Sequence, residues 1–391
     1  MSSQNKICLL GSSISQYPLA KFLKLRKITF DYISSYPSHP FDRAGGTFIK
    51  CDLKNTEKAI RFCRSGGYER VLSMGSDICC RLLSLLSDKK IISEKFIVPV
   101  ELYDTFFDKK TFQSDFDHSN PIKNLIISLN GPWPEELQNF LNTNGNCIVK
   151  PVDAYASKGV SSISSNEDFI SITRKSFQKS PSKTLLVQKT IVKDGLQICG
   201  DGYIENSKIK FLKLGFNKSY NSGFIPLLEA FPSFEIECTE DIKIELTSVI
   251  KNAGIKNSFF NVDIIISDGK IHVLEIALRL GGNCISDAIF YSTGKNLLDI
   301  YFCGHLKKIA HTPMHCINFM LHSKKGGFFD KKMISQFSGF KELNCFLQNS
   351  DILEPVMNNS KTFGNLVYVF SNYKKFSDAL EIGTELGNIN K

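Results

Sequence analysis

The sequence lacks the long apolar runs and the leader pattern that mark membrane and secreted proteins. No apolar stretch approaches the ~20 residues that a membrane-spanning helix needs. The first residues, MSSQNK, do not show the basic segment followed by an apolar one that is typical of a signal peptide. The chain also has no internal repeat and no low-complexity segment. We therefore expect a soluble, cytoplasmic protein with no membrane partner.

Paired cysteine motifs are missing as well. The chain has twelve cysteines, but none of them forms a CxxC pair, and several stand within apolar runs, as Cys8, Cys63 and Cys316 do. Isolated cysteines in apolar surroundings are typical of buried free thiols. The pattern argues against structural zinc and against disulfides, which fits a reducing compartment.

A concentrated basic segment is the third feature that the sequence lacks. The formal net charge is +9 at pH 7, from 48 Lys and Arg against 39 Asp and Glu. The basic residues are spread along the chain, without the stripe and the interleaved aromatics of nucleic-acid-binding surfaces. We therefore expect small anionic molecules as partners, and no nucleic acid.

The first hundred residues show a regular alternation of strand and helix patterns. This alternation runs from Lys6 to Ile92 and predicts a parallel sheet with helices on both faces. The turn GSS at 11–13 is either a phosphate-binding turn or a tight connection from strand to helix. Asp77 follows a later strand, where we expect it to cap a helix, with substrate contact as the alternative. With 391 residues and 42% hydrophobic content, the whole chain is long enough for two or three domains.

A β-hairpin with one acid on each arm is predicted near residue 270. Two aliphatic runs, 262–266 and 272–277, are joined by the turn SDGK. The turn places Asp263 and Glu275 at comparable heights on adjacent strands, with both carboxylates on one face. Two carboxylates there repel unless a cation lies between them, and Mg²⁺ binds one or two protein carboxylates together with phosphate oxygens. The alternative is an ordinary hairpin with surface acids.

Three further segments have the composition of ligand-binding regions. The loop PVDAYASKGV at 151–160 is small, polar and basic, so its backbone N–H groups can hold phosphates together with Lys150 and Lys158. A plain hairpin loop with solvated lysines is the alternative for it. Segment 216–234 is rich in Gly, Pro, Ser and aromatics, which indicates a substrate-facing loop. After the hairpin, Arg279 adds a cation, and Gly281 and Gly282 that follow it add a flexible backbone.

Taken in order, these segments resemble the ATP-grasp superfamily. Its members include D-alanine-D-alanine ligase, L-amino-acid ligases, carbamoyl phosphate synthetase and biotin carboxylase. The likeness spans nearly the whole chain. Each motif alone is short, so the resemblance depends on the order and spacing of the motifs. The motifs are the segment Asp108-Lys109, Lys150 with its SKG loop, the strand LLVQKTI, the tripeptide GLQ at 195–197, and the hairpin acids with Arg279.

The resemblance implies an α/β fold with α+β character in the ATP-grasp part. A Rossmann-like N-terminal domain would cover 1–100, the ATP-grasp domain 101–305, and a C-terminal closing subdomain 306–391. Within the ATP-grasp domain, the nucleotide subdomain would cover about 120–190, and the metal-binding and catalytic part about 191–305.

The resemblance also assigns roles to individual residues. The implied metal ligands are Asp263 and Glu275, which would bind two Mg²⁺ ions, with Mn²⁺ as a substitute. The implied catalytic residues are Arg279, Lys158 and Asn283: Arg279 and Asn283 would steady the acyl phosphate and the substrate carboxylate, and Lys158 belongs to the loop that would fold over the γ-phosphate. Residues that would contact ATP are Lys109, Lys150, Ser157 and Gly159 at the phosphates, Gln188, Lys189 and Ile191 at the adenine, and Gln197 at the ribose.

Three positions depart from the family pattern. Gln188 and Gln197 replace the usual glutamates, but a glutamine carbonyl still accepts hydrogen bonds from an adenine amine or a ribose hydroxyl. Ala277 replaces the asparagine of the pattern E-x-N-x-R, which is a metal ligand. One ligand of the second Mg²⁺ would then come from water, from a bidentate Glu275 or from elsewhere.

The function that the resemblance implies is ATP-dependent ligation of a carboxylate to an amine. A small carboxylate, an amino acid or a related acid, would be activated as an acyl phosphate and joined to an amine, which gives an amide or peptide bond with ADP and phosphate. The expected partners are these small molecules, and a homodimer is left open. Two alternatives remain at this point: a carboxylase-type enzyme that phosphorylates bicarbonate, and a nucleotide-binding regulator with a reduced metal site.

Overall fold

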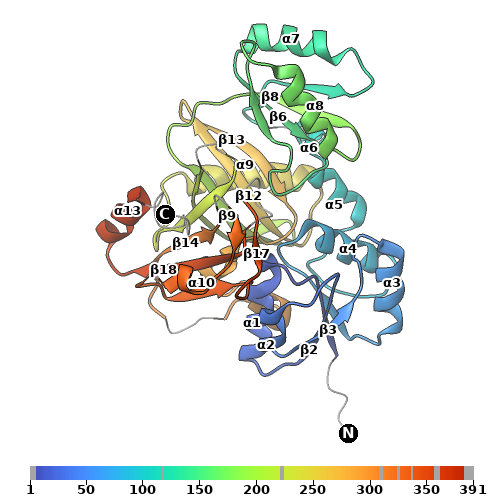
Figure 1. Ribbon diagram of the computed structural model, residues 1–391, viewed down its shortest axis with the longest axis vertical. Helices are drawn as coiled ribbons and strands as arrows, with labels where there is room; N and C mark the ends of the chain where they lie inside the picture. Colours follow the sequence, from blue (N-terminus) through green and yellow to red (C-terminus); the bar gives the residue numbers. More distant parts are fainter. Residues whose placement is uncertain are drawn as a thin grey trace.

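A computed structural model describes residues 6–116, 118–220, 224–307, 311–323, 326–335, 338–355 and 362–382 of the chain. The strands of these residues form two four-stranded sheets, one eight-stranded sheet and one two-stranded sheet. Figure 1 shows the unit that contains β6, β8, α7 and α8 projecting from the rest of the molecule, with the N-terminal helices and strands at the opposite end.

The N-terminal residues form the parallel sheet that the sequence predicts, in the strand order β3-β2-β1-β4. Both faces of this sheet are buried: Leu9 and Leu72 pack into one apolar cluster, and Leu10 and Val71 into another. Helices therefore cover both faces. The elements are β1 (Ile7–Leu10), η1 (Ile14–Gln16), α1 (Tyr17–Leu25), β2 (Phe30–Ser34), α2 (His39–Arg43), β3 (Gly46–Lys50), α3 (Thr56–Ser65), β4 (Arg70–Leu72) and α4 (Asp77–Asp88).

The projecting unit is built on a four-stranded antiparallel sheet in the order β5-β8-β6-β7. One face of the sheet packs Val149, Val187 and their neighbours against Trp133 and Phe177 of the two helices. The opposite face, which alternates with the first, carries Lys150 and Gln188. The elements are β5 (Asn124–Ser128), α7 (Trp133–Asn144), β6 (Cys147–Pro151), β7 (Ser161–Ile163), α8 (Phe169–Lys179) and β8 (Thr184–Lys189), and α5 (Val100–Phe107) and α6 (Lys109–Asp115) lead into this unit.

The remaining long strands form one antiparallel sheet in the order β13-β12-β9-β10-β11-β14-β18-β16. Its strands are β9 (Gln197–Glu205), β10 (Lys208–Ser219), β11 (Pro226–Phe231), β12 (Ser258–Ser267), β13 (Lys270–Ala277), β14 (His315–Leu321), β16 (Glu342–Cys345) and β18 (Gly364–Phe370). The other elements of this part are α9 (Thr239–Asn252), α10 (Ile285–Thr293), α11 (Leu298–Cys303), β15 (Gly327–Phe328), α12 (Lys332–Ser335), β17 (Ile352–Leu353) and α13 (Tyr373–Ile382).

The eight-stranded sheet bears on three sequence-based expectations. The prediction of a substrate-facing loop at 216–234 is wrong for most of its described residues, because they continue β10 and form β11, which pair with each other. Gly, Pro and aromatic content indicated a loop there, but β pairing depends on long-range partners. The sequence also predicts a closing helix over 373–386, and the structure has it as α13 as far as Ile382, while 383–386 lie outside the described residues. The predicted border near residue 305 falls within the span of this one sheet, and the domain borders stay predictions.

The N-terminal sheet and the eight-stranded sheet share one apolar core. Leu9 and Leu72 belong to the same cluster as Cys199 and Phe231 of the large sheet and Ile289 of α10. Salt bridges join the same parts, because Lys21 of α1 pairs with Asp287 of α10 and with Glu342 of β16. The N-terminal domain is therefore fixed against the face of the large sheet that carries the candidate site.

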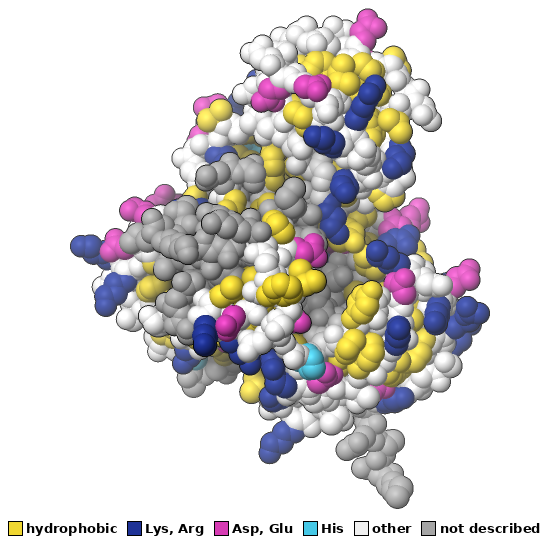
Figure 2. All heavy atoms as spheres, in the orientation of Figure 1, with side chains coloured by type: hydrophobic (Ala, Val, Ile, Leu, Met, Phe, Trp, Pro, Cys, Tyr) yellow, Lys and Arg dark blue, Asp and Glu magenta, His cyan; other side chains and the backbone are white. Residues whose placement is uncertain are grey.

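The surface and the cysteines agree with the composition. All twelve cysteines are free, and nine of them are buried. No described helix is long and apolar enough to cross a membrane. On the face shown in Figure 2, described Lys and Arg side chains are spread among Asp and Glu side chains and do not gather in one stripe.

Candidate active site

The two acids of the hairpin lie opposite each other, as the sequence predicts. Asp263 of β12 and Glu275 of β13 are register partners, so both side chains point to the same face of the sheet. The Gln197 side chain of the neighbouring strand donates a hydrogen bond to Asp263 Oδ1 at 2.9 Å. Burial and the adjacent Glu275 charge raise the pKa of Asp263 to about 6. The pair is therefore short of positive charge.

The residues present fit Mg²⁺ with phosphate and water as its other ligands. Among the described residues, no group of three or more His, Cys, Asp or Glu side chains is arranged to enclose a metal ion. Two carboxylates on one face are the typical protein contribution to a Mg²⁺ site whose remaining ligands are phosphate oxygens and water. Asp263 and Glu275 form such a pair.

Two lysines form the opposite wall of the site. Lys150 stands on β6, and the Lys109 amine at the start of α6 donates to the Ala154 carbonyl at 2.7 Å. Burial and the neighbouring Lys109 charge lower the pKa of Lys150 to about 8. This wall is short of negative charge, just as the hairpin wall is short of positive charge.

A cavity of about 180 Å³ lies between these walls. It brings together eight of the thirteen residues for which the sequence predicts a role: Lys109, Lys150, Ser157, Lys158, Gln197, Asp263, Glu275 and Arg279. The five that do not line it are Gly159, Gln188, Lys189, Ile191 and Asn283. Strands that are distant in the sequence supply the lining, so the cavity exists only in the folded chain.

The loop after β6 has an unusual backbone. Ala156 and Ser157 have φ angles of 55° and 56°, in the left-handed region that residues other than glycine rarely adopt. Gly159 has a φ of 76°, and a Cβ atom there would lie 2.9 Å from both Pro151 and Lys179. The loop is fixed at its ends, because Asp153 accepts from Ser180 and Ser182, and Ser157 donates to the Phe224 carbonyl. The Lys158 amine lies 4.2 Å from the centre of the Tyr155 ring.

One of the predicted adenine contacts, Gln188, lies on the same sheet face as Lys150. Gln188 pairs with Ile148, and Lys150 with Leu186, so the Gln188 and Lys150 side chains share a face of this sheet. The Gln188 side chain is buried, and its Nε2 donates to no described residue. A buried amide N–H without an acceptor costs free energy. The Gln188 amide therefore has the environment of a group that donates a hydrogen bond to a ligand. Lys189 is exposed and Ile191 half-buried.

Arg279 is held by an acid of the N-terminal domain. Its Nε and Nη2 donate to the two oxygens of Asp77 at 2.6 and 3.2 Å, and its Nη1 donates to the Leu280 carbonyl at 3.0 Å. The prediction that Asp77 caps a helix is wrong: Ser76 is the N-cap residue, and Asp77 is the first residue of α4. The Arg279 charge holds the pKa of Asp77 below its usual value, although burial acts in the opposite direction. The available signal was an acid at the end of a turn that leads from a strand of the parallel sheet into a helix.

Asn283 lies behind the cavity and not in its lining. Its side chain donates to the buried Glu229 carboxylate at 3.4 Å, and its carbonyl accepts from Asn318 at 2.6 Å. Burial raises the pKa of Glu229 well above its usual value. Nearby, burial raises the pKa of Asp201 to about 7. Sequence reasoning missed Glu229 and Asp201, because a single acid within an apolar strand has no local signature.

Ala277 stands opposite an asparagine. It pairs with Asn261 in the hairpin register and shares a sheet face with Glu275. The Asn261 side chain donates to Asp201 Oδ1 at 2.8 Å and to the Gly200 carbonyl at 3.0 Å. The Asn261 amide therefore lies on the adjacent strand, opposite Ala277, where the E-x-N-x-R pattern has an asparagine.

Solved structures of ligases and synthetases share the fold of this chain. An L-amino acid ligase from Bacillus licheniformis aligns over 98% of both chains, with a TM-score of 0.75 and 13% identity. A phosphoribosylglycinamide synthetase from Anaerococcus prevotii also aligns over 98% of both, with a TM-score of 0.68 and 16% identity. An N5-carboxyaminoimidazole synthetase from Staphylococcus aureus, complexed with ADP, aligns over 97% of both, with a TM-score of 0.71 and 14% identity.

At these identities the likeness establishes the fold and nothing finer. No protein-family model and no curated protein matches the sequence.

Proposed function

We propose that this chain is an ATP-dependent ligase that activates a small carboxylate as an acyl phosphate and joins it to an amine. The observation that carries the proposal is the charge arrangement of the cavity. Lys109 and Lys150 line the cavity together with Asp263 and Glu275, and although the two sets attract each other, burial still lowers the pKa of Lys150 and raises the pKa of Asp263. A triphosphate with divalent cations satisfies both walls together, because its oxygens pair with the lysines and the cations pair with the carboxylates.

The nucleotide would lie along the inner face of the projecting unit. In this proposal the adenine end reaches the unpaired Gln188 amide and the main chain near Lys189 and Ile191, and the phosphates reach Lys150 and Lys109. Gln197 stands at the hairpin, where it already orients Asp263. The loop with Ser157, Lys158 and Gly159 would close over the terminal phosphate, because Ser157 and Lys158 line the cavity together with Lys150.

The reaction we propose has two steps. An oxygen of the substrate carboxylate attacks the γ-phosphorus, the bond to the ADP oxygen breaks, and an acyl phosphate and ADP result. The amine nitrogen then attacks the acyl carbon, phosphate leaves, and the amide forms with loss of the amine proton. Mg²⁺ held by Asp263 and Glu275 would neutralise charge on the phosphoryl group. The contribution of this chain is positioning and electrostatics, since none of the roles needs a covalent enzyme intermediate.

Arg279 is the group that would bind the anionic substrate. It lines the cavity between the hairpin and the N-terminal domain. Because Asp77 occupies its Nε and one Nη2 hydrogen, and Leu280 one Nη1 hydrogen, the remaining two N–H groups are left for a carboxylate or an acyl phosphate oxygen. Asn283 donates to Glu229 outside the cavity lining, so we give it a supporting role and no substrate contact.

Bicarbonate is the second candidate for the acid. A biotin carboxylase domain from Hydrogenobacter thermophilus, solved with MgADP and bicarbonate, aligns over 97% of this chain and 89% of that domain, with a TM-score of 0.72 and 12% identity. The same phosphate and metal residues serve either acid, so the cavity charges alone do not choose between them.

The test is ADP release measured across a panel of amino acids, other small carboxylates and bicarbonate, each with and without amines. We expect turnover that needs Mg²⁺, one carboxylate and one amine. Turnover with bicarbonate and no other acid would replace the ligase by a carboxylase-type reaction. Absence of Mg²⁺-dependent turnover with every pair, in a chain that still binds ATP, would favour a regulator.

Glu275→Gln gives the matching site test. It keeps the side-chain volume but removes one of the two metal-binding charges, so we expect turnover to fall by at least about a thousandfold while the fold persists. Asp268→Asn is the control, because Asp268 is an exposed acid in the turn of the same hairpin. Near-normal ADP release by Glu275→Gln would refute the metal assignment.

A further inference from the structure

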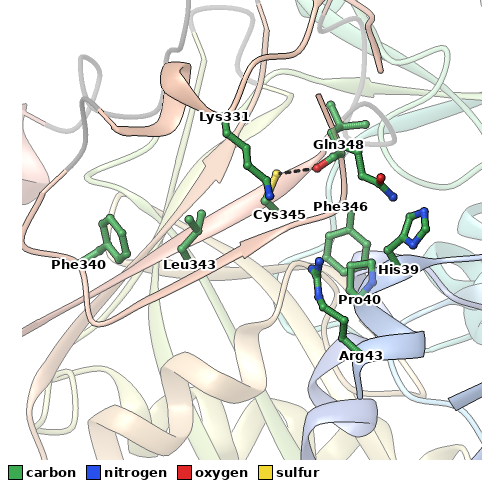
Figure 3. Close-up of a pocket in the computed structure, with 10 residues that line it drawn as sticks. His39, Pro40, Arg43, Lys331, Phe340, Leu343, Cys345, Phe346 and Gln348 are labelled. Carbon is green, nitrogen blue, oxygen red and sulfur yellow. Dashed lines mark hydrogen bonds between the residues drawn. The ribbon is translucent and has the colours of Figure 1, made fainter. Parts of the chain in front are cut away.

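A second and larger cavity lies between the N-terminal domain and the C-terminal part of the chain. Its volume is about 390 Å³, and none of its lining residues lines the candidate active site. It is bounded by α2 on one side and by β16 with its flanking segments on the other (Figure 3). Pockets of about 300–1,000 Å³ are the usual size for small-molecule sites, so the volume suits a ligand.

The floor of this cavity is apolar and held in place. Leu343 is fixed by β16, which pairs with β18 at the edge of the large sheet. Phe346 packs edge-on against Tyr17 of α1, with ring centres 5.3 Å apart. Pro40 of α2 is buried and completes the apolar part of the lining. The walls therefore come from elements that the fold already positions.

The rim of the cavity is cationic. Arg43 and Lys331 come from opposite walls, and both side chains extend toward the apolar floor (Figure 3). Neither forms a salt bridge with an acid of the described residues. His39 stands beside Arg43 on the same helix, and no acid belongs to the lining. Asp42 lines an adjoining hollow together with Arg43 and Lys331, lies 3.9 Å from His39 Nδ1, and accepts a hydrogen bond from Tyr32 at 2.5 Å.

We infer that this cavity binds a small amphipathic anion. The anionic head, a carboxylate or a phosphate, lies between Arg43 and Lys331, and an apolar body of aromatic or short-chain size packs on Phe346 and Leu343. An anionic head pairs with the exposed cations Arg43 and Lys331, and an apolar body covers the floor that a purely ionic ligand would leave in water. Because Arg43 and Lys331 belong to different parts of the chain, the ligand bridges them. The inference does not depend on the proposed ligase function.

The test uses two fluorescent probes with the same kind of apolar body. The probe 8-anilinonaphthalene-1-sulfonate carries an anionic group, whereas N-phenyl-1-naphthylamine is neutral. We expect the full-length protein to bind the anionic probe at least about tenfold more tightly. Equal affinity for the two probes would overturn the inference, because charge would then play no part.

Variants locate the probe. Arg43→Gln combined with Lys331→Gln removes both charges and keeps the side-chain stems, so we expect about tenfold weaker binding of the anionic probe. The matched control is Arg174→Gln with Lys175→Gln, two exposed cations on α8, which we expect to change nothing. Circular dichroism confirms that each variant is folded. Unchanged binding of the anionic probe by the Arg43→Gln, Lys331→Gln variant overturns the assignment. The assignment also fails if the wild type is a dimer and this variant is a monomer, because a second copy of the chain then covers the cavity.

Competition identifies the head group. Octanoate and octyl phosphate share an apolar chain and differ in the head, and 1-octanol has the chain without a charge. We expect one or both anions to displace the bound probe at concentrations at which octanol does not. Displacement by neither anion, or equal displacement by octanol, overturns the inference.

Discussion

At the scale of single residues, Lys150 makes ATP binding depend on pH. Its pKa is lowered to about 8 by burial and by the Lys109 charge, and the protonated amine is the form that pairs with a phosphate. If only this form binds, the dissociation constant of ATP rises about tenfold between pH 7 and pH 9. Titration calorimetry at several pH values measures this rise.

Lys150→Met is the control for this prediction. It removes the titrating amine, so ATP binding should be weaker at pH 7 and nearly flat from pH 7 to 9. The same slope in the variant would assign the titration to another group. The sign for stability is opposite: between pH 8 and 10.5 the unfolded chain binds more protons at this position, so the free energy of unfolding of the ligand-free protein rises with pH there.

The ion pair of Asp77 and Arg279 is expected to contribute to the free energy of unfolding. Both side chains are largely buried, at 14% and 12% exposure, and Asp77→Asn would leave the guanidinium charge without its partner. We expect this variant to lower the free energy of unfolding by about 3 kcal/mol. Asp77→Asn with Arg279→Gln removes both charges and should cost less than the sum of the single changes. Urea denaturation of the three variants measures this coupling, and strict additivity would show that the pair does not act as a unit.

At the scale of elements, the hairpin β12–β13 decides how the second metal is held. Ala277→Asn adds an amide on the face that carries Glu275, so activity should saturate at a free Mg²⁺ concentration at least about threefold lower. Ala277→Val fills similar space without a ligand oxygen and serves as the control. Activity titrated against free Mg²⁺ compares the three forms. An unshifted midpoint in Ala277→Asn would mean that another group, such as the facing Asn261, already supplies the ligand.

The same elements show what local sequence could predict. The hairpin and the pairing of Asp263 with Glu275 follow from two aliphatic runs and a tight turn, which act within a short window. The strands at 216–219 and 226–231 do not, because their composition favours a loop and only the neighbouring strands of the large sheet make them extended. Glu229 lies on the second of these strands and was missed for the same reason.

At the scale of the whole molecule, Lys21 joins three parts of the chain. It pairs with Asp287 at 2.6 Å and with Glu342, which belong to α10 and to the edge strand β16. Lys21→Met leaves two neighbouring carboxylates without their cation, so we expect the free energy of unfolding to fall by about 3 kcal/mol. Lys24→Met, an exposed lysine on the same helix, is the control and should cost less than about 0.5 kcal/mol.

Two signals follow this unfolding. Trp133 is the single tryptophan and lies in the projecting unit, so its fluorescence reports that unit, while far-ultraviolet circular dichroism reports the whole chain. If the Lys21 contacts stabilise the assembly of domains, the two signals should coincide in the wild type and separate in Lys21→Met. Unchanged stability would mean that the shared apolar core alone holds the parts together.

The sequence by itself determined some of the elements and the order of the motifs. Alternating strands and helices in the first hundred residues, the hairpin with its two acids, and the lysines at 109 and 150 are each encoded by periodicity or by residue type over a few positions. The tertiary structure alone decided that Asp77 meets Arg279, 202 residues away, that eight strands between β9 and β18 form one sheet while β15 and β17 pair apart from it, and that Asp201 and Glu229 are buried beside the site. Such contacts depend on which strand edges pair and which faces are covered, and the entropy of closing long loops is offset only when the whole core forms at once.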